Sequence, residues 1–258
     1  MTFSYIICGF FVGILIGLTG VGGGSLMTPL LTIIFGINPS VAIGTDLVFS
    51  TITKSAGTFV HKLKSTVHWE IVKLFCIGAI PSSIITIFLI KYYISISDQI
   101  NLILSYLISF SVLLTAFSVI FRNKIKVLVG KNKSYQLSGK NLTIMTIISG
   151  IFLGFLVTIS SIGAGAIGAT VLIILYPKLT ASEIAGTDLA YAVPLTAVAS
   201  VGHWWIGTIN WSLLILLLFG SIPGIILGSL MSKSIPENFL RTILAAVLVI
   251  VAVKVVYV

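Results

Sequence analysis

Long hydrophobic stretches alternate with short polar segments along the whole chain, five stretches in each half. They cover residues 4–19, 25–36, 40–60, 69–90 and 100–120, then 142–159, 166–176, 181–202, 211–231 and 238–257. A helix needs about 20 apolar residues to cross a bilayer. The pattern therefore predicts an all-α membrane protein, a polytopic helical bundle with about 8–10 membrane segments.

The second stretch of each half is too short to cross comfortably. About twelve residues of helix span about 18 Å, whereas the hydrocarbon core is about 30 Å thick. Each short stretch also follows a glycine cluster, GLTGVGGGSLMTP at 17–29 and ISSIGAGAIGA at 159–169. The sequence thus predicts a short broken half-helix in each half of the chain.

The two halves repeat each other. The sequence Gly44-Thr45-Asp46-Leu47 returns 142 positions later as Gly186-Thr187-Asp188-Leu189. The same offset relates further landmarks: His61 and His203, Trp69 and Trp211, and Pro81 and Pro223. We expect one membrane domain made of repeat 1 (1–120) and repeat 2 (142–258). With five segments per repeat, the two repeats enter the membrane inverted, as in many secondary transporters.

Composition and charge strengthen the membrane assignment. Only 8% of the residues are charged, compared with about 25% in soluble domains. The segment 121–141 holds six of the fifteen basic residues and no acidic one. We expect it to be a flexible cytoplasmic loop, because basic loops stay on the cytoplasmic side. The net charge of +9 then sets the orientation of a multi-pass protein of the cell (cytoplasmic) membrane, and does not indicate nucleic-acid binding.

The glycine breaks are the first candidate binding site. A half-helix that starts after a break directs unpaired backbone N–H groups and a positive dipole end toward the gap, which suits an anion. The alternative is close helix packing through small residues. The candidate substrate contacts here are Gly22, Gly23, Gly24 and Ser25 in the first break, and Ser160, Ser161, Gly163 and Gly165 in the second.

The two Gly-Thr-Asp triplets are the second candidate. Asn38-Pro39 and the capping-box sequence Thr180–Glu183 each predict a helix start eight residues before an aspartate. Eight helical residues rise about 12 Å, so Asp46 and Asp188 should lie inside the bilayer thickness, beside Thr45 and Thr187. Such acids are functional by default. They would either carry protons or hydrogen-bond the backbone of a broken segment.

Lys54 and the paired histidines complete the candidates. Lys54 lies two turns after Asp46, and repeat 2 has Thr196 in its place. Its side chain would either neutralise a bound anion or snorkel to the nearby cytoplasmic boundary, and its position near the helix end favours snorkelling. His61 and His203 end equivalent helices, and we expect both to be interfacial.

The chain resembles the TauE/SafE sulfite-exporter family, also called the 4-toluene sulfonate uptake permease family. The likeness rests on Gly20–Pro29 (GVGGGSLMTP), on Ala42–Leu47 (AIGTDL) and on Ala185–Leu189 (AGTDL), and covers nearly the whole chain. The second repeat departs from the usual pattern at Ala164 and Thr170. The resemblance implies a membrane permease for sulfur-containing anions such as sulfite or organosulfonates.

These observations predict a secondary transporter for a small sulfur-containing anion, with the lipid bilayer as its other partner and protons as a potential coupling ion. We expect no enzymatic activity, no cofactor and no metal. The alternatives are a transporter of a different small anion and a non-enzymatic membrane subunit that assists another protein.

Overall fold

In the computed structural model, which describes residues 2–19, 24–63, 65–96, 100–131, 138–231 and 246, the regular elements are α-helices. In chain order they are α1 (Thr2–Thr19), α2 (Gly24–Ile33), α3 (Pro39–Leu63), α4 (Trp69–Ile96), α5 (Ile100–Lys131), α6 (Gly139–Ser160), α7 (Ala166–Leu175), α8 (Ala181–Ile206) and α9 (Trp211–Met231). They match the first nine predicted stretches. The tenth, 238–257, lies outside the described residues apart from Ala246.

Five helices of the described part are long and apolar enough to cross a membrane. Their spans are 69–92 in α4, 101–129 in α5, 139–160 in α6, 181–206 in α8 and 211–228 in α9. Side chains on the outside of the bundle are large and hydrophobic, such as Phe88, Phe110 and Phe219. This combination shows a multi-pass helical membrane protein.

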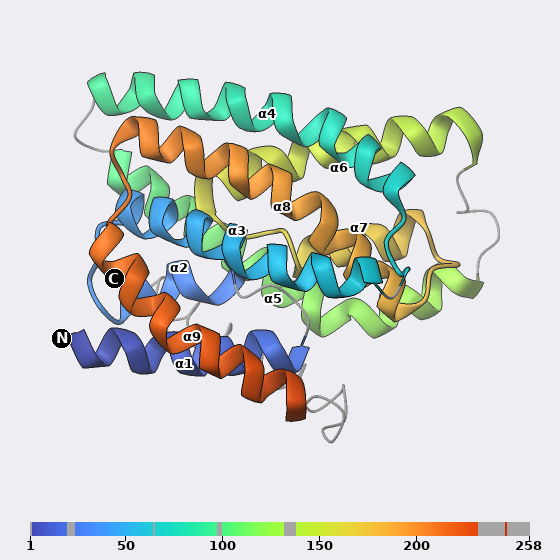
Figure 1. Cartoon of the computed structure of the whole chain (residues 1–258). Coiled ribbons are helices and arrows are strands. Elements are labelled where there is room, and N and C mark those ends of the chain that lie inside the picture. Colours follow the sequence, from blue (N-terminus) through green and yellow to red (C-terminus); the bar gives the residue numbers. More distant parts are fainter. Residues whose placement is uncertain are drawn as a thin grey trace.

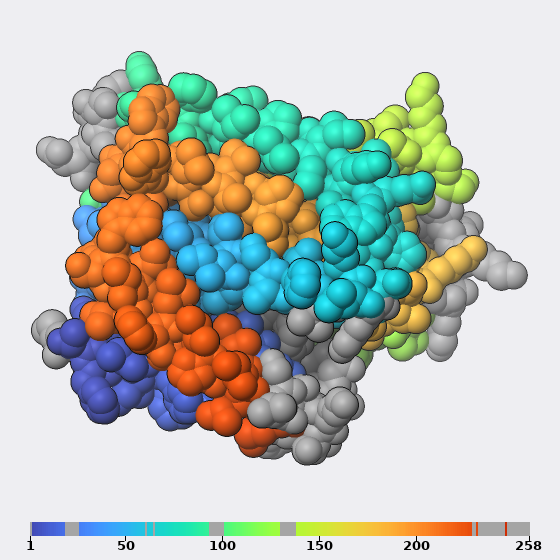
Figure 2. Space-filling model, viewed as in Figure 1, coloured from blue at the N-terminus to red at the C-terminus, as the bar shows by residue number. Residues whose placement is uncertain are grey.

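The helices pair in a regular way. Figure 1 shows α4 and α6 along one edge of the bundle and α1 and α9 along the opposite edge, with α3 and α8 between them. If α1 to α5 form repeat 1, the equivalents of α1, α3 and α4 in repeat 2 are α6, α8 and α9. The pair of α1 with α9 is then equivalent to the pair of α6 with α4, and the central pair joins two equivalent helices, α3 and α8. The pairing is consistent with two inverted repeats. On the face in Figure 2, α1, α3, α4, α8 and α9 form one continuous surface.

Glycines let the outer pairs approach closely. A Cβ atom on Gly78 of α4 would collide with the backbone of α6 at Ile147, and one on Gly220 of α9 would collide with the backbone of α1 at Ile6. Small residues at such contacts are the usual means of packing helices in a membrane. Gly78 and Gly220 are also 142 positions apart, so both outer pairs use glycine at an equivalent position.

The two short helices, α2 and α7, have ten residues each, or about 15 Å of helix. Neither can cross the hydrocarbon core alone. Residues 26–29 of α2 and 166–170 of α7 are buried, α2 against α3 and α7 against α5 and α8. The prediction of a short half-helix in each half of the chain is confirmed.

One boundary prediction was wrong. Residues 121–131 belong to the end of α5, and α6 already begins at Gly139, so only the middle of the predicted 121–141 loop separates them. The segment 121–129 has no glycine or proline and is rich in Lys, Ile, Val and Leu. Positive charge alone does not end a helix, because lysine is a good helix former.

Candidate functional site

The second glycine break is a fully buried turn between α6 and α7. Ser161, with φ of 58°, ends α6, and Gly163 and Gly165 have φ of 127° and 125°. Three left-handed residues within five positions take the chain out of helical geometry. All residues from Ser160 to Thr170 are buried, so the freed backbone groups face protein and not lipid.

The first break is described only at its edges. α1 ends at Thr19 and α2 begins at Gly24. Gly22 and Gly23 lie outside the described residues, and so does the side chain of Ser25. The start of α2 is nevertheless fixed by a contact from α3, because Asp46 reaches it.

Asp46 is fully buried in α3 and holds α2 in place. Its Oδ2 atom accepts hydrogen bonds from the Thr28 backbone N–H at 3.2 Å and from the Thr28 hydroxyl at 2.6 Å. Its Oδ1 atom accepts a longer one, 3.3 Å, from Ser50. The predicted helix start is confirmed: Asn38 Oδ1 caps α3 by accepting from the Ser40 N–H at 3.1 Å. Asp46 therefore binds backbone of a broken segment, one of the two roles left open for it.

Asp188 occupies the equivalent place in α8 and is 3% exposed. Its Oδ1 atom accepts from the Tyr191 hydroxyl at 2.9 Å, and it also meets the backbone N–H of Gly165 at the start of α7. A Cβ atom on Gly168 of α7 would overlap both Asp188 and the Tyr191 hydroxyl, so glycine is required there. The predicted capping box of Thr180 and Glu183 is present at the start of this helix.

Lys54 does not snorkel to the boundary. It is 1% exposed, and its Nζ atom donates to the carbonyl oxygen of Ala164 at 3.1 Å. That carbonyl belongs to the second break, so a side chain of α3 enters the break between α6 and α7. Its ammonium charge also acts on both Asp188 and Asp46. The sequence position near the end of the helix misled the prediction, because α3 packs against α8 and the ammonium meets a carbonyl of the buried break.

Ser161 brings a hydroxyl to the same place. It is 1% exposed, and its Oγ atom is close to Asp46 but makes no hydrogen bond in the described part of the chain. Ser160, by contrast, uses its hydroxyl within the break, accepting from the Ile162 N–H at 3.2 Å and donating to the Leu156 carbonyl. Of the two serines predicted in the second break, only Ser161 has a hydroxyl without a hydrogen bond.

The threonines of the two triplets contact loops instead of the breaks. Thr187 Oγ1 accepts from the backbone N–H of His68, before α4, and Thr45 Oγ1 accepts from the backbone N–H of Asn210, before α9, both at 3.1 Å. The neighbouring Gly44 and Gly186 leave room for the same two loops at Thr208 and Thr66. We call these two contacts the loop interlocks. Each of these residues in one loop interlock has an equivalent in the other interlock, 142 positions away.

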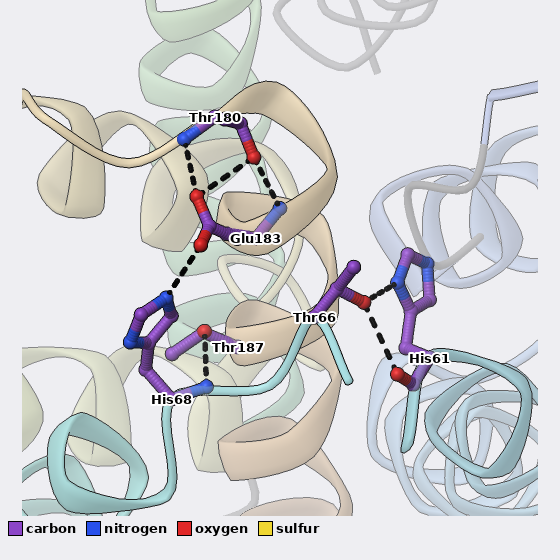
Figure 3. A network of polar contacts seen from close by, with 6 residues as sticks. All are labelled: His61, Thr66, His68, Thr180, Glu183 and Thr187. Carbon is purple, nitrogen blue, oxygen red and sulfur yellow. Dashed lines mark hydrogen bonds and ion pairs between the residues drawn. The ribbon is translucent and has the colours of Figure 1, made fainter. Parts of the chain in front are cut away.

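Figure 3 shows one interlock in detail. The loop between α3 and α4 lies against the first turns of α8, where His68 Nε2 meets Glu183 Oε1 at 3.0 Å and the His61 ring meets the Thr66 hydroxyl at 2.8 Å. In the other interlock His203 makes the equivalent contact with Thr208 at 2.9 Å. His203 is 0% exposed, and its second ring nitrogen contacts the Thr158 carbonyl of α6. Its position at the membrane interface stays a prediction.

We predict that each interlock stabilises the fold by a modest amount. Thr45→Val or Thr187→Val leaves a loop N–H without its acceptor and should cost about 1–3 kcal/mol of unfolding free energy. Thermal unfolding of the purified protein measures the change. Thr45→Ser and Thr187→Ser are the controls, since they keep the hydroxyl and should stay close to wild type. Equal losses in the valine and serine variants would contradict the role of the hydroxyl.

The structure thus gathers Asp46, Lys54, Ser161 and Asp188, which we call the central cluster, around the second break. Gly163 and Gly165 shape that break, while Thr45, Thr187 and Ser160 serve neighbouring backbone. The prediction missed Thr28, Ser50 and Tyr191. Tyr191 had a signal, because it lies three residues after Asp188 on the same helix face. For Thr28, on another helix, the sequence offers none.

A pocket of about 450 Å³ lies elsewhere, between the α2–α3 loop and α5. Its lining includes Asn38, Asn101 and Tyr106 and shares no residue with the central cluster. Among the described residues, no charged side chain lines it. Within the described residues there is also no group of three or more His, Cys, Asp or Glu side chains arranged to hold a metal ion.

The fold and the buried charged cluster are typical of a polytopic membrane transporter. The family model for the sulfite exporter TauE/SafE matches residues 5–255, and the chain belongs to this family. It is 37% identical to the probable membrane transporter protein YjnA of Bacillus subtilis, over 98% of this chain and 99% of that one. A probable membrane transporter protein of Methanocaldococcus jannaschii is 27% identical over 94% and 91% of the two chains. No solved structure matches.

Proposed function

We propose that this protein is a secondary transporter that moves a small sulfur-containing anion, such as sulfite or an organosulfonate, across the cytoplasmic membrane without changing it chemically. Membership of a membrane transporter family supports transport. The sulfur-containing anion is suggested by the family name. The site and its mechanism are argued from the central cluster.

One observation carries the proposed site: a buried ammonium group and a buried hydroxyl without a partner meet at a broken helix. Lys54 Nζ and Ser161 Oγ are both at the second break. They offer one positive charge and one hydrogen-bond donor, and the start of α7 adds the positive end of a helix dipole. An oxyanion needs this set of groups, because its oxygens only accept hydrogen bonds.

The two predicted repeats would move against each other to open the site to one side at a time. The loop interlocks join the repeats at two places, and in each triplet the interlock threonine precedes the site aspartate directly. A shift of either loop would therefore be transmitted to Asp46 or Asp188 through one peptide bond. Rocking of inverted repeats around a central site is the usual route to alternating access.

The test is a ligand screen followed by transport. The purified protein is heated with sulfite, thiosulfate, methanesulfonate, sulfate or acetate, and stabilisation by one class identifies the bound anion. The same anion is then followed into proteoliposomes that contain only this chain. Uptake by the purified chain would exclude a helper subunit. Stabilisation by acetate alone would contradict the sulfur-containing substrate.

We predict that Ser161→Ala weakens anion binding. The variant loses one hydrogen bond to a charged group, worth about 1.5–3 kcal/mol, so the apparent dissociation constant should rise about tenfold or more. Ser65→Ala is a close control, because Ser65 is the other left-handed non-glycine residue in the described part of the chain, with φ of 53°, but is exposed in a loop. If both variants bind alike, Ser161 does not contact the anion.

A further inference from the structure

We propose that the two carboxylates of the central cluster take up one proton with each monovalent anion, so that the transported unit carries no net charge. The inference rests on the proposed function and adds the coupling ion and its stoichiometry. The argument starts from the charges of the cluster and their surroundings.

The central cluster holds three ionisable side chains that are almost completely buried. Asp46, Lys54 and Asp188 are 0%, 1% and 3% exposed. The single ammonium acts on both carboxylates, which come from different helices, α3 and α8. With all three groups ionised, the cluster carries one excess negative charge. An isolated buried charge is costly, so a second excess negative charge in the cluster would be strongly unfavourable.

The other groups around the carboxylates do not remove this excess. Around Asp46 they are the neutral donors of Thr28 and Ser50, with the Ser161 hydroxyl close by. Asp188 accepts from Tyr191, and Cys76 of α4 acts on that tyrosine. Arg122 of α5 also acts on Asp188, but it is the weakest contributor and is half-buried, so water and salt screen its charge more than that of Lys54.

An incoming monovalent anion would double the excess charge unless a proton came with it. A proton on either carboxylate returns the cluster to the single excess charge of its empty state. Two carboxylates near one ammonium titrate as a unit, so the proton belongs to the pair and not to one residue. This explains why an anion site contains two acids: they are the means by which anion and proton bind together.

Replacing one of the two acids by its amide should uncouple anion binding from proton binding. In Asp188→Asn the empty cluster is neutral, and an anion alone brings it to the single excess charge that wild type carries. Anion movement then needs no proton and becomes electrogenic. Asp46→Asn has the same charge but loses strength in the contact to Thr28. Glu70→Gln is the control, because Glu70 is an exposed acid at the start of α4.

The experiment uses proteoliposomes and radiolabelled methanesulfonate, whose charge does not change with pH. Uptake is driven either by a pH gradient with the membrane potential clamped to zero, or by a potassium diffusion potential without a pH gradient. In wild type and Glu70→Gln, a gradient of one pH unit should accumulate the anion up to about tenfold, and the potential should have no effect. In Asp188→Asn the potential should drive uptake and the pH gradient should not.

Each outcome decides. Wild-type uptake that follows the potential, or an Asp188→Asn variant that stays driven by the pH gradient, overturns the inference and leaves the proposed function standing. If wild type moves only sulfite, the same readouts are taken with sulfite in mildly acidic buffer, where it is mainly bisulfite. If wild type moves neither anion, the proposed function fails first.

A binding measurement tests the inference in a variant that folds but does not transport. In detergent, stabilisation of wild type by methanesulfonate should weaken as the pH rises, whereas that of Asp188→Asn should be independent of pH. The same pH dependence in both proteins would overturn the inference. If Asp188→Asn does not fold, Asp46→Asn is measured in its place.

Discussion

Lys54→Met should abolish transport and strongly destabilise the protein. The substitution keeps the apolar stem of the side chain but removes the ammonium whose charge acts on both Asp46 and Asp188, and it leaves the Ala164 carbonyl in the break without its donor. The loss leaves two buried carboxylates without the positive charge that compensates them, and uncompensated buried charge costs about 3–5 kcal/mol. Thermal unfolding in detergent measures the loss of stability, and uptake by proteoliposomes measures the loss of function.

Two further variants separate charge from packing. Lys62→Met, on the exposed end of the same helix, should leave stability and uptake near wild type. Lys54→Met combined with Asp46→Asn removes one charge of each sign, so it should be more stable than Lys54→Met alone while remaining inactive. If the double variant were less stable than the single one by the full cost of Asp46→Asn, the charges would not be coupled.

Gly78→Leu should prevent the stable pairing of α4 with α6. Its side chain would have to occupy the place of the α6 backbone at Ile147 and Ile151. Overpacking usually costs about 1–3 kcal/mol and sometimes more, and here rigid backbone must move instead of a flexible side chain. We therefore expect a loss of about 3 kcal/mol or more, seen as a low yield of monodisperse protein and a reduced unfolding temperature.

The neighbouring position provides the control for added volume. Ile77 is 58% exposed on the outer surface of α4, so Ile77→Phe adds a large side chain where lipid can give way. This variant should behave like wild type. Equal destabilisation by Gly78→Leu and Ile77→Phe would show that α4 is sensitive to volume in general and not to close approach of α6.

The positions of the helices were largely predictable from the sequence, because membrane helices satisfy their own backbone hydrogen bonds and so follow local hydrophobicity. The caps at Asn38 and Thr180 were predictable for the same reason: each acts within four residues. The end of α5 was not, since the basic residues after Phe121 are as compatible with helix as with loop.

The side-chain contacts show where local information ends. Repetition of the Gly-Thr-Asp triplet indicated that all three residues matter, but it did not show which part of the protein each of them contacts. Thr45 and Thr187 contact loop residues that are 165 and 119 positions away, whereas the adjacent aspartates face the breaks. Successive residues of a helix point about 100° apart, and only the packing of α3 against α8 decides what lies in each direction.

The sequence by itself determined the class of protein, the nine described helices in outline, the two breaks and the helix caps eight residues before each aspartate. These follow from hydrophobic length, glycine content and repetition, which are local properties of the chain. Only the tertiary structure decided that Lys54 is buried in the second break and that His203 contacts the backbone of α6. Both depend on α3 and α8 lying at the centre, where a polar side chain meets protein groups instead of the membrane surface.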